Sequence, residues 1–222
     1  MEGVGRRVTT PNFLLRRFPM NSKNKNLYSL VITAVLLAIG MVLPFITGQI
    51  QAIAKIISPL HIPVLICGLC CGWKWGLGLG IILPLLRGLI FGIPVFPTSA
   101  LPMAFELATY GLLTGLIYMT LLKLLKLKNR LPAMMIALVT AMIIGRFVGG
   151  AAKALLISVG IIGTKDPFTF SAFFTSYFVS TAPGAVIHLI VVPAVVMAVE
   201  KLRMSPVIFE WIMSRSNTKN DL

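Results

Sequence analysis

Residues 61–111 form an almost wholly apolar stretch that, apart from Lys74, contains two charged side chains, Arg87 and Glu106. Each lies inside its own hydrophobic run, and the turn between the runs, residues 92–97, carries no charge. A charged side chain at the centre of a bilayer costs about 2.5–3.5 kcal/mol or more, and such residues mark functional sites. This stretch therefore predicts membrane helices with a charged site between them.

The composition agrees with an integral membrane protein of one domain. The 222 residues are 57% hydrophobic and 12% charged, with a mean hydropathy of +0.93, whereas soluble domains carry about 25% charged residues. We expect an all-α fold with six transmembrane helices, at residues 27–46, 60–72, 75–91, 98–122, 132–159 and 170–199. The second is short, because a straight span needs about 20 residues.

The basic residues predict the orientation of these helices. Of the 20 Lys and Arg residues, fifteen lie in segments that share one side if both termini are cytoplasmic, and only Lys55 and Lys165 lie in the opposite loops. Because cytoplasmic loops are enriched in Lys and Arg, both termini are expected inside a bacterial-type cell membrane. The net charge of +14 then indicates contact with anionic lipid, and no nucleic acid partner is expected.

The same pattern divides the chain into three parts. Residues 1–26 are basic and are expected to be a disordered cytoplasmic terminus, because they lack an apolar core that could pack. Residues 27–200 are expected to form the six-helix substrate-binding domain, and residues 201–222 a basic cytoplasmic tail.

Helix geometry places three buried charges at one depth. With a rise of about 1.5 Å per residue, Arg87 and Arg146 lie about 18–20 Å above the inner face, and Glu106 lies about 12 Å below the outer face. Lys153 is seven residues after Arg146, on the same helical face and nearer the outer boundary. Three cations and one carboxylate indicate either a structural Arg–Glu pair with a snorkelling lysine or, as we favour, a site for an anionic ligand.

Other residues are weaker candidates for this site. His61 and Tyr110 lie on the two apolar runs next to these charges, although a lone histidine in apolar surroundings is more often structural. Residues 47–59 are apolar on one helical face and are expected to form a lid that contributes Gln49. Cys67, Cys70 and Cys71 lack the partners of a metal site and are interpreted as small buried hydrophobic residues.

Ala34 and Ala38 give the first helix a small-xxx-small face. Small residues at this spacing allow another helix to approach closely. The spacing alone fits binding of a partner and internal packing equally well.

Four motifs, in this order, together with the Ala34/Ala38 face and the apolar lid, resemble the substrate-binding S components of energy-coupling factor (ECF) transporters: HIPVLICGLCCGWKWG, ILPLLRGLIFG, PMAFELATYG and APGAVIHLIVVPAVV. The resemblance covers about residues 27–200. It implies a vitamin or similar small molecule bound near the outer surface. It also implies a coupling module of one transmembrane subunit and two ATPases, docked on the face of Ala34 and Ala38.

The chain contains no motif for catalysis. It has no Ser/His/Asp arrangement, HExxH or Walker A sequence, so neither an enzymatic activity nor a cofactor is expected and ATP must be hydrolysed by a partner. Two alternatives remain at this stage: an autonomous secondary transporter of a small organic anion, and an intramembrane enzyme that acts on an anionic lipid.

Overall fold

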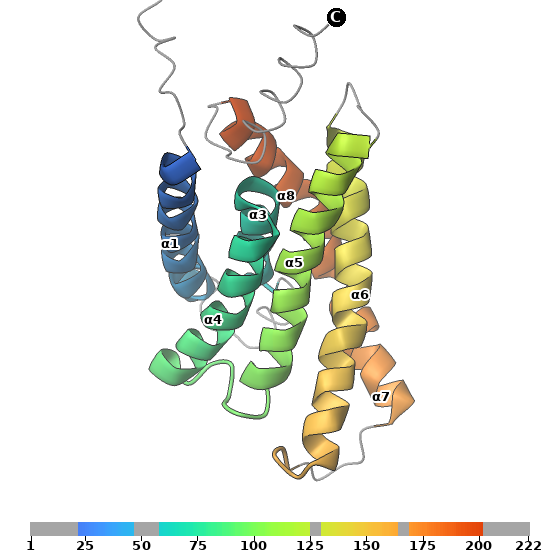
Figure 1. Cartoon of the computed structure of the whole chain (residues 1–222). Coiled ribbons are helices and arrows are strands. Elements are labelled where there is room, and N and C mark those ends of the chain that lie inside the picture. The colour runs from blue at the N-terminus through green and yellow to red at the C-terminus, as the bar shows by residue number, and fades with distance from the viewer. Residues whose placement is uncertain (1–21, 47–57, 125–129, 164–168, 202–222) are drawn as a thin grey trace, which may run out of the picture.

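The computed structural model describes residues 22–46, 58–124, 130–163 and 169–201, and this part of the chain is a bundle of helices with no strand (Figure 1). The helices, in chain order, are α1 (Ser22–Ile46), α3 (His61–Cys71), α4 (Trp73–Phe91), α5 (Ala100–Leu124), α6 (Leu131–Ser158), α7 (Phe170–Phe174), the π-helix η2 (Thr175–Val179) and α8 (Ala182–Lys201).

Five helical segments of the described chain are long and apolar enough to cross a membrane: Lys25–Phe45, Trp73–Phe91, Ala100–Leu124, Leu131–Ser158 and Phe170–Glu200. The chain is therefore a multi-pass, all-α membrane protein. Helix α3 has 11 residues, which span about 16 Å, about half of the hydrocarbon core. All but one of its residues are buried in the bundle. Each of the six predicted segments is helical, but a sixth complete crossing remains a prediction.

Glycines allow α3, α4 and α5 to pack with their backbones in close contact. A Cβ atom added at Gly76 of α4 would lie 2.6 Å from the Gly111 carbonyl oxygen of α5, and one at Gly68 of α3 would lie 2.8 Å from the same oxygen. Gly80 and Gly115 are equally close to backbone atoms of the facing helices. Helix α5 is therefore the central element of the bundle, and its position is fixed by contacts that exclude any side chain.

The last apolar run is not one regular helix. It is interrupted by η2, where the Ser180 N–H donates to the Thr175 carbonyl at 2.9 Å instead of to residue 176. Pro183 follows and has no N–H to donate to the carbonyl of residue 179. The Thr181 hydroxyl donates to the Tyr177 carbonyl at 2.6 Å. Pro183 is thus preceded by a π-helical turn, a feature often found at functional sites.

The two ends of the bundle differ. The first turn of α1, the last turns of α5 and α8 and the first turn of α6 lie at one end, and residues 92–99 and the end of α6 lie at the other (Figure 1). At the first end, Glu200 accepts hydrogen bonds from the Tyr118 hydroxyl at 3.0 Å and from Arg130 at 3.3 Å. The two described chain ends therefore share one side, while the side of the membrane on which they lie remains a prediction.

Several expectations fall on residues outside the described ranges. These are the state of residues 1–21 and 202–222, and the lid with Gln49, most of which lies at residues 47–57. The boundaries of the three parts of the chain likewise remain predictions.

Candidate functional site

A cavity of about 420 Å³ lies at the end of the bundle that carries residues 92–99. Side chains from α1, α3, α4, α5, α6, η2 and α8 line it, so segments from almost the whole described chain meet there. Its charged and histidine lining residues are Arg87, Glu106, Arg146, Lys153, His61 and His188. The remaining lining is mostly apolar and includes Pro44, Pro59, Leu60, Ile93, Pro94, Val95, Pro102 and Met103. The size and the mixture of many apolar and a few polar groups are typical of a small-molecule site.

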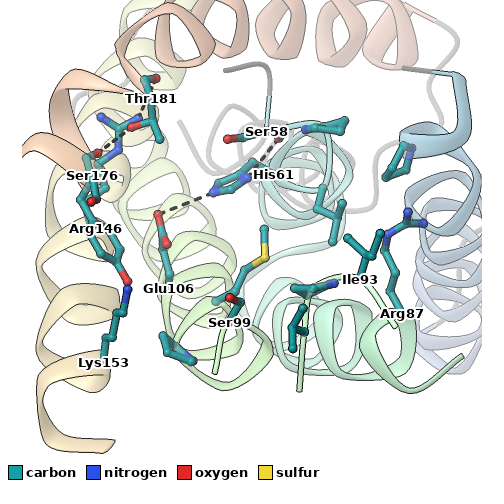
Figure 2. A pocket seen from close by; sticks show the side chains of 18 of the residues that line it. Ser58, His61, Arg87, Ile93, Ser99, Glu106, Arg146, Lys153, Ser176 and Thr181 are labelled. Atoms are coloured by element: carbon teal, nitrogen blue, oxygen red, sulfur yellow. Dashed lines mark hydrogen bonds and ion pairs between the residues drawn. The ribbon is translucent and has the colours of Figure 1, made fainter. Parts of the chain in front are cut away.

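Glu106 of α5 is the carboxylate of this cavity. Its Oε1 accepts a hydrogen bond from the Tyr110 hydroxyl at 2.7 Å and lies 3.6 Å from His61 Nε2. Tyr110 is four residues further along the same helix, the spacing at which side chains on one helical face meet. His61 comes from α3, and Figure 2 shows the imidazole and the carboxylate directed toward each other. The three side chains form one polar cluster on the cavity wall.

Tyr110 supports this cluster from behind. Its side chain is fully buried and is not among the residues that line the cavity. Gly145 and Gly149 of α6 make the space for it and for Glu106. A Cβ atom at Gly145 would collide with the Tyr110 ring, and one at Gly149 would lie 2.8 Å from the Glu106 Cβ. The contact between α5 and α6 thus fixes the position of the Glu106 carboxylate.

His61 is held on three sides. Its Nδ1 lies within hydrogen-bonding distance, 3.1 Å, of the Ser58 carbonyl oxygen. Its ring stacks on the His188 ring, with centroids 5.5 Å apart and an interplanar angle of 19°. His188 belongs to α8 and is 1% exposed. The two histidines link α3 and α8 at the cavity, and the sequence marked His61 only as a weak candidate.

Arg146 and Lys153 lie on α6, on the same side of the cavity as Glu106 (Figure 2). Arg146 donates to the Thr181 carbonyl at 3.4 Å, and its guanidinium carbon lies 5.7 Å from the centre of the Phe178 ring. Both partners belong to the irregular segment that contains η2. That segment therefore positions Arg146 at the cavity.

Arg87 lies across the cavity from these residues, beside Ile93 (Figure 2). Its Nη1 donates to the Met41 carbonyl of α1 at 2.6 Å. The guanidinium carbon lies 5.3 Å from the Phe45 ring centre and 5.4 Å from that of Phe91. Arg87 thus binds α1 to α4, and its side chain has little contact with the cavity, because the residue is 1% exposed.

The structure therefore brings together the four charged residues singled out from the sequence, together with His61. Glu106 contacts His61 and Tyr110, and Arg87 contacts a main-chain carbonyl, so Arg87 and Glu106 do not form an ion pair with each other. Sequence reasoning did not identify the polar groups of η2 and its neighbours, namely Ser176, Tyr177 and Thr181. The π-helix that presents them has no signature in the sequence beyond the nearby proline.

The comparison with protein-family models gave a match over residues 28–199, more than half of the chain, to the model described as "ECF transporter, substrate-specific component". The chain belongs to this family. This S component is therefore a substrate-specific transport subunit and not an enzyme. Proteins of its family work with a module that contains membrane and ATPase subunits. The comparisons with curated proteins and with solved structures gave no match.

Ala34 and Ala38 lie outside the bundle of the S component. Both are exposed on α1, and so are the neighbouring Val31, Val35 and Val42. The side of α1 that packs against the bundle is formed by other residues, including Leu36 and Gly40. The small-residue face is therefore not used for packing among the described helices.

Proposed function

We propose that the S component captures a small organic anion, a water-soluble vitamin or a related metabolite, from outside the cell. The observation that carries the proposal is the charge of the cavity. Three cations, Arg87, Arg146 and Lys153, and one carboxylate, Glu106, line it, so its formal charge is +2 with both histidines neutral.

Energetics support an anionic ligand. Unbalanced charges in low-dielectric surroundings are costly, and an anion that enters the cavity offsets this cost. The guanidinium of Arg146 matches a carboxylate in shape and can form two parallel hydrogen bonds to it. A carboxylate vitamin of the pantothenate or nicotinate kind has the required charge and size.

The test compares each acid with its neutral counterpart. Binding of pantothenate and panthenol, and of nicotinate and nicotinamide, is measured by calorimetry on the purified S component, and native mass spectrometry identifies any molecule that co-purifies. We expect an acid to bind at least about tenfold more tightly than its neutral counterpart, because a charge-assisted hydrogen bond contributes about 1.5–3 kcal/mol. Arg146→Gln should abolish this preference.

Lys123→Gln is the matched control, because Lys123 is an exposed cation in the last turn of α5, at the other end of the bundle. It should leave binding unchanged. Equal binding of acids and neutral counterparts, with no effect of Arg146→Gln, would contradict the proposal.

Energy for uptake comes, in this proposal, from an ECF coupling subunit and two ATPase subunits that dock on α1 through Ala34 and Ala38. The support is the family of the S component and the exposure of the two alanines, which leaves a flat apolar surface for another helix. Uptake by the S component alone in liposomes would instead favour an autonomous transporter.

A further inference from the structure

The environment of Arg87 differs from that of the other two cations. One edge of its guanidinium donates to the Met41 carbonyl at 2.6 Å, and two phenyl rings, of Phe45 and Phe91, lie within 5.4 Å of its carbon. Met41 lies in the helical turn before Pro44, and Pro44 lacks the N–H that would donate to the carbonyl four residues earlier. At 1% exposure, Arg87 offers almost no surface to a ligand.

Arg146 is more accessible. It is only partly buried; it donates to the Thr181 carbonyl, and its guanidinium lies near the Phe178 ring. A guanidinium has five N–H groups, so Arg146 retains donors for a ligand. With Lys153 it forms the cationic side of the cavity, and Glu106 lies on the same side (Figure 2). The formal charge of these three side chains, two cations and one carboxylate, is +1.

Glu106 also has an acceptor for a ligand. Both of its contacts, from Tyr110 and His61, involve Oε1. Among the described residues, no hydrogen bond or ion pair involves Oε2, which lies beside Gly149. The side chain is 13% exposed, and it lines the cavity. A carboxylate oxygen in such surroundings is stabilised by a donor, and a bound substrate can supply one.

We propose, on the basis of the proposed function, that the substrate is a monoanion with a neutral hydrogen-bond donor and an aliphatic body. Its acid group binds Arg146 and Lys153, and its hydroxyl or amide N–H donates to Oε2 of Glu106. Its body lies against the prolines and aliphatic side chains of the lining, such as Leu60, Ile93 and Pro94. Arg87 does not contact the substrate; it is a positioning residue that holds α1 against α4.

The test uses four probes with one branched carbon skeleton. These are α-hydroxyisocaproate, isocaproate without the hydroxyl, the amide of α-hydroxyisocaproate without the charge, and isopropylmalate with a second carboxylate. Dissociation constants are measured by ligand-detected NMR at millimolar probe concentration on the purified S component. We expect α-hydroxyisocaproate to bind at least about tenfold more tightly than the amide, and more tightly than isocaproate and isopropylmalate.

Variants separate the two roles of the arginines. Arg146→Gln should reduce the ratio of acid to amide affinity to about one, whereas Arg87→Lys should leave this ratio unchanged even if it lowers thermal stability. Glu106→Gln removes the negative charge of the site and should shift preference toward isopropylmalate. Lys123→Gln should change none of these ratios.

The outcomes distinguish this inference from the proposed function. Equal affinity for acid and amide would overturn both. Preference of the unaltered protein for isopropylmalate, equal binding of isocaproate, or loss of the acid preference in Arg87→Lys would overturn the inference and leave an anion site in place. Absence of binding by all four probes would also overturn the inference, because each required group is present in the series.

Discussion

Replacement of Gly76 by alanine tests whether the backbone contact between α4 and α5 holds the bundle together. The new Cβ atom would lie 2.6 Å from the Gly111 carbonyl oxygen, 2.9 Å from its carbonyl carbon and 2.9 Å from the Gly68 Cα. Carbon atoms in favourable contact are about 3.5–4.0 Å apart. All three neighbours are backbone atoms, so no side-chain rotation relieves the collision and the helices must separate.

Gly78, two residues further along α4, is the matched control. A Cβ atom there has nothing within 4 Å, so Gly78→Ala changes helix propensity without changing packing. Alanine is favoured over glycine inside a helix by about 0.8–1.0 kcal/mol. Gly76→Ala has the same gain but adds an overpacking cost of about 1–3 kcal/mol. The difference between the two variants therefore isolates the cost of the collision.

The assay is thermal unfolding of both variants and the unaltered protein in one detergent at one scan rate. At about 2–4 °C per kcal/mol for a chain of this size, Gly76→Ala should unfold several degrees below Gly78→Ala. Gly76→Ala should also weaken substrate binding, because a displaced α5 carries Glu106 with it. Equal unfolding temperatures would show that α4 and α5 are not in this contact, and the placement of the carboxylate at the cavity would then be wrong.

Two further predictions concern the membrane and the partner. Lys165→Cys should react with a membrane-impermeant thiol reagent added outside cells and Lys128→Cys should not, against a background in which the three native cysteines are replaced; the reverse result would refute cytoplasmic termini. Replacement of both Ala34 and Ala38 by leucine should leave substrate affinity unchanged but abolish ATP-driven uptake and co-purification with the coupling module. Retained co-purification with full uptake would exclude this face of α1 as the docking site.

The helices of the S component could be predicted from hydropathy because the hydrophobic runs are long and uninterrupted. The helix ends were less accurate: α1 begins at Ser22, before the predicted residue 27, because polar residues can extend a helix beyond the apolar run. The separation of η2 from α8 was not predicted. The π-helical hydrogen bond from Ser180 to Thr175 depends on local backbone geometry that hydropathy does not describe.

Helix packing shows where a spacing rule stops being informative. The small-xxx-small pattern was noted at Ala34 and Ala38, which are exposed. The same spacing occurs at Gly76 and Gly80 and at Gly111 and Gly115, and these glycines form the contacts between α4, α5 and α3. The pattern identifies a face that permits close approach. It does not identify the helix that packs on this face, because that depends on how the helices are arranged in the bundle.

The charged site illustrates the same limit at the level of chemistry. A rise of about 1.5 Å per residue predicted one depth for Arg87, Glu106 and Arg146, and in the structure all three line one cavity. Depth does not determine the direction in which a side chain points. The contact of Glu106 with Tyr110 follows from their spacing of four residues, but its contact with His61 needs the position of α3. A main-chain acceptor such as the Met41 carbonyl has no side-chain signature, so sequence reasoning could count three cations but could not identify the acceptors that they meet. The charge that remains for a substrate therefore becomes clear only when the partner of each cation is known.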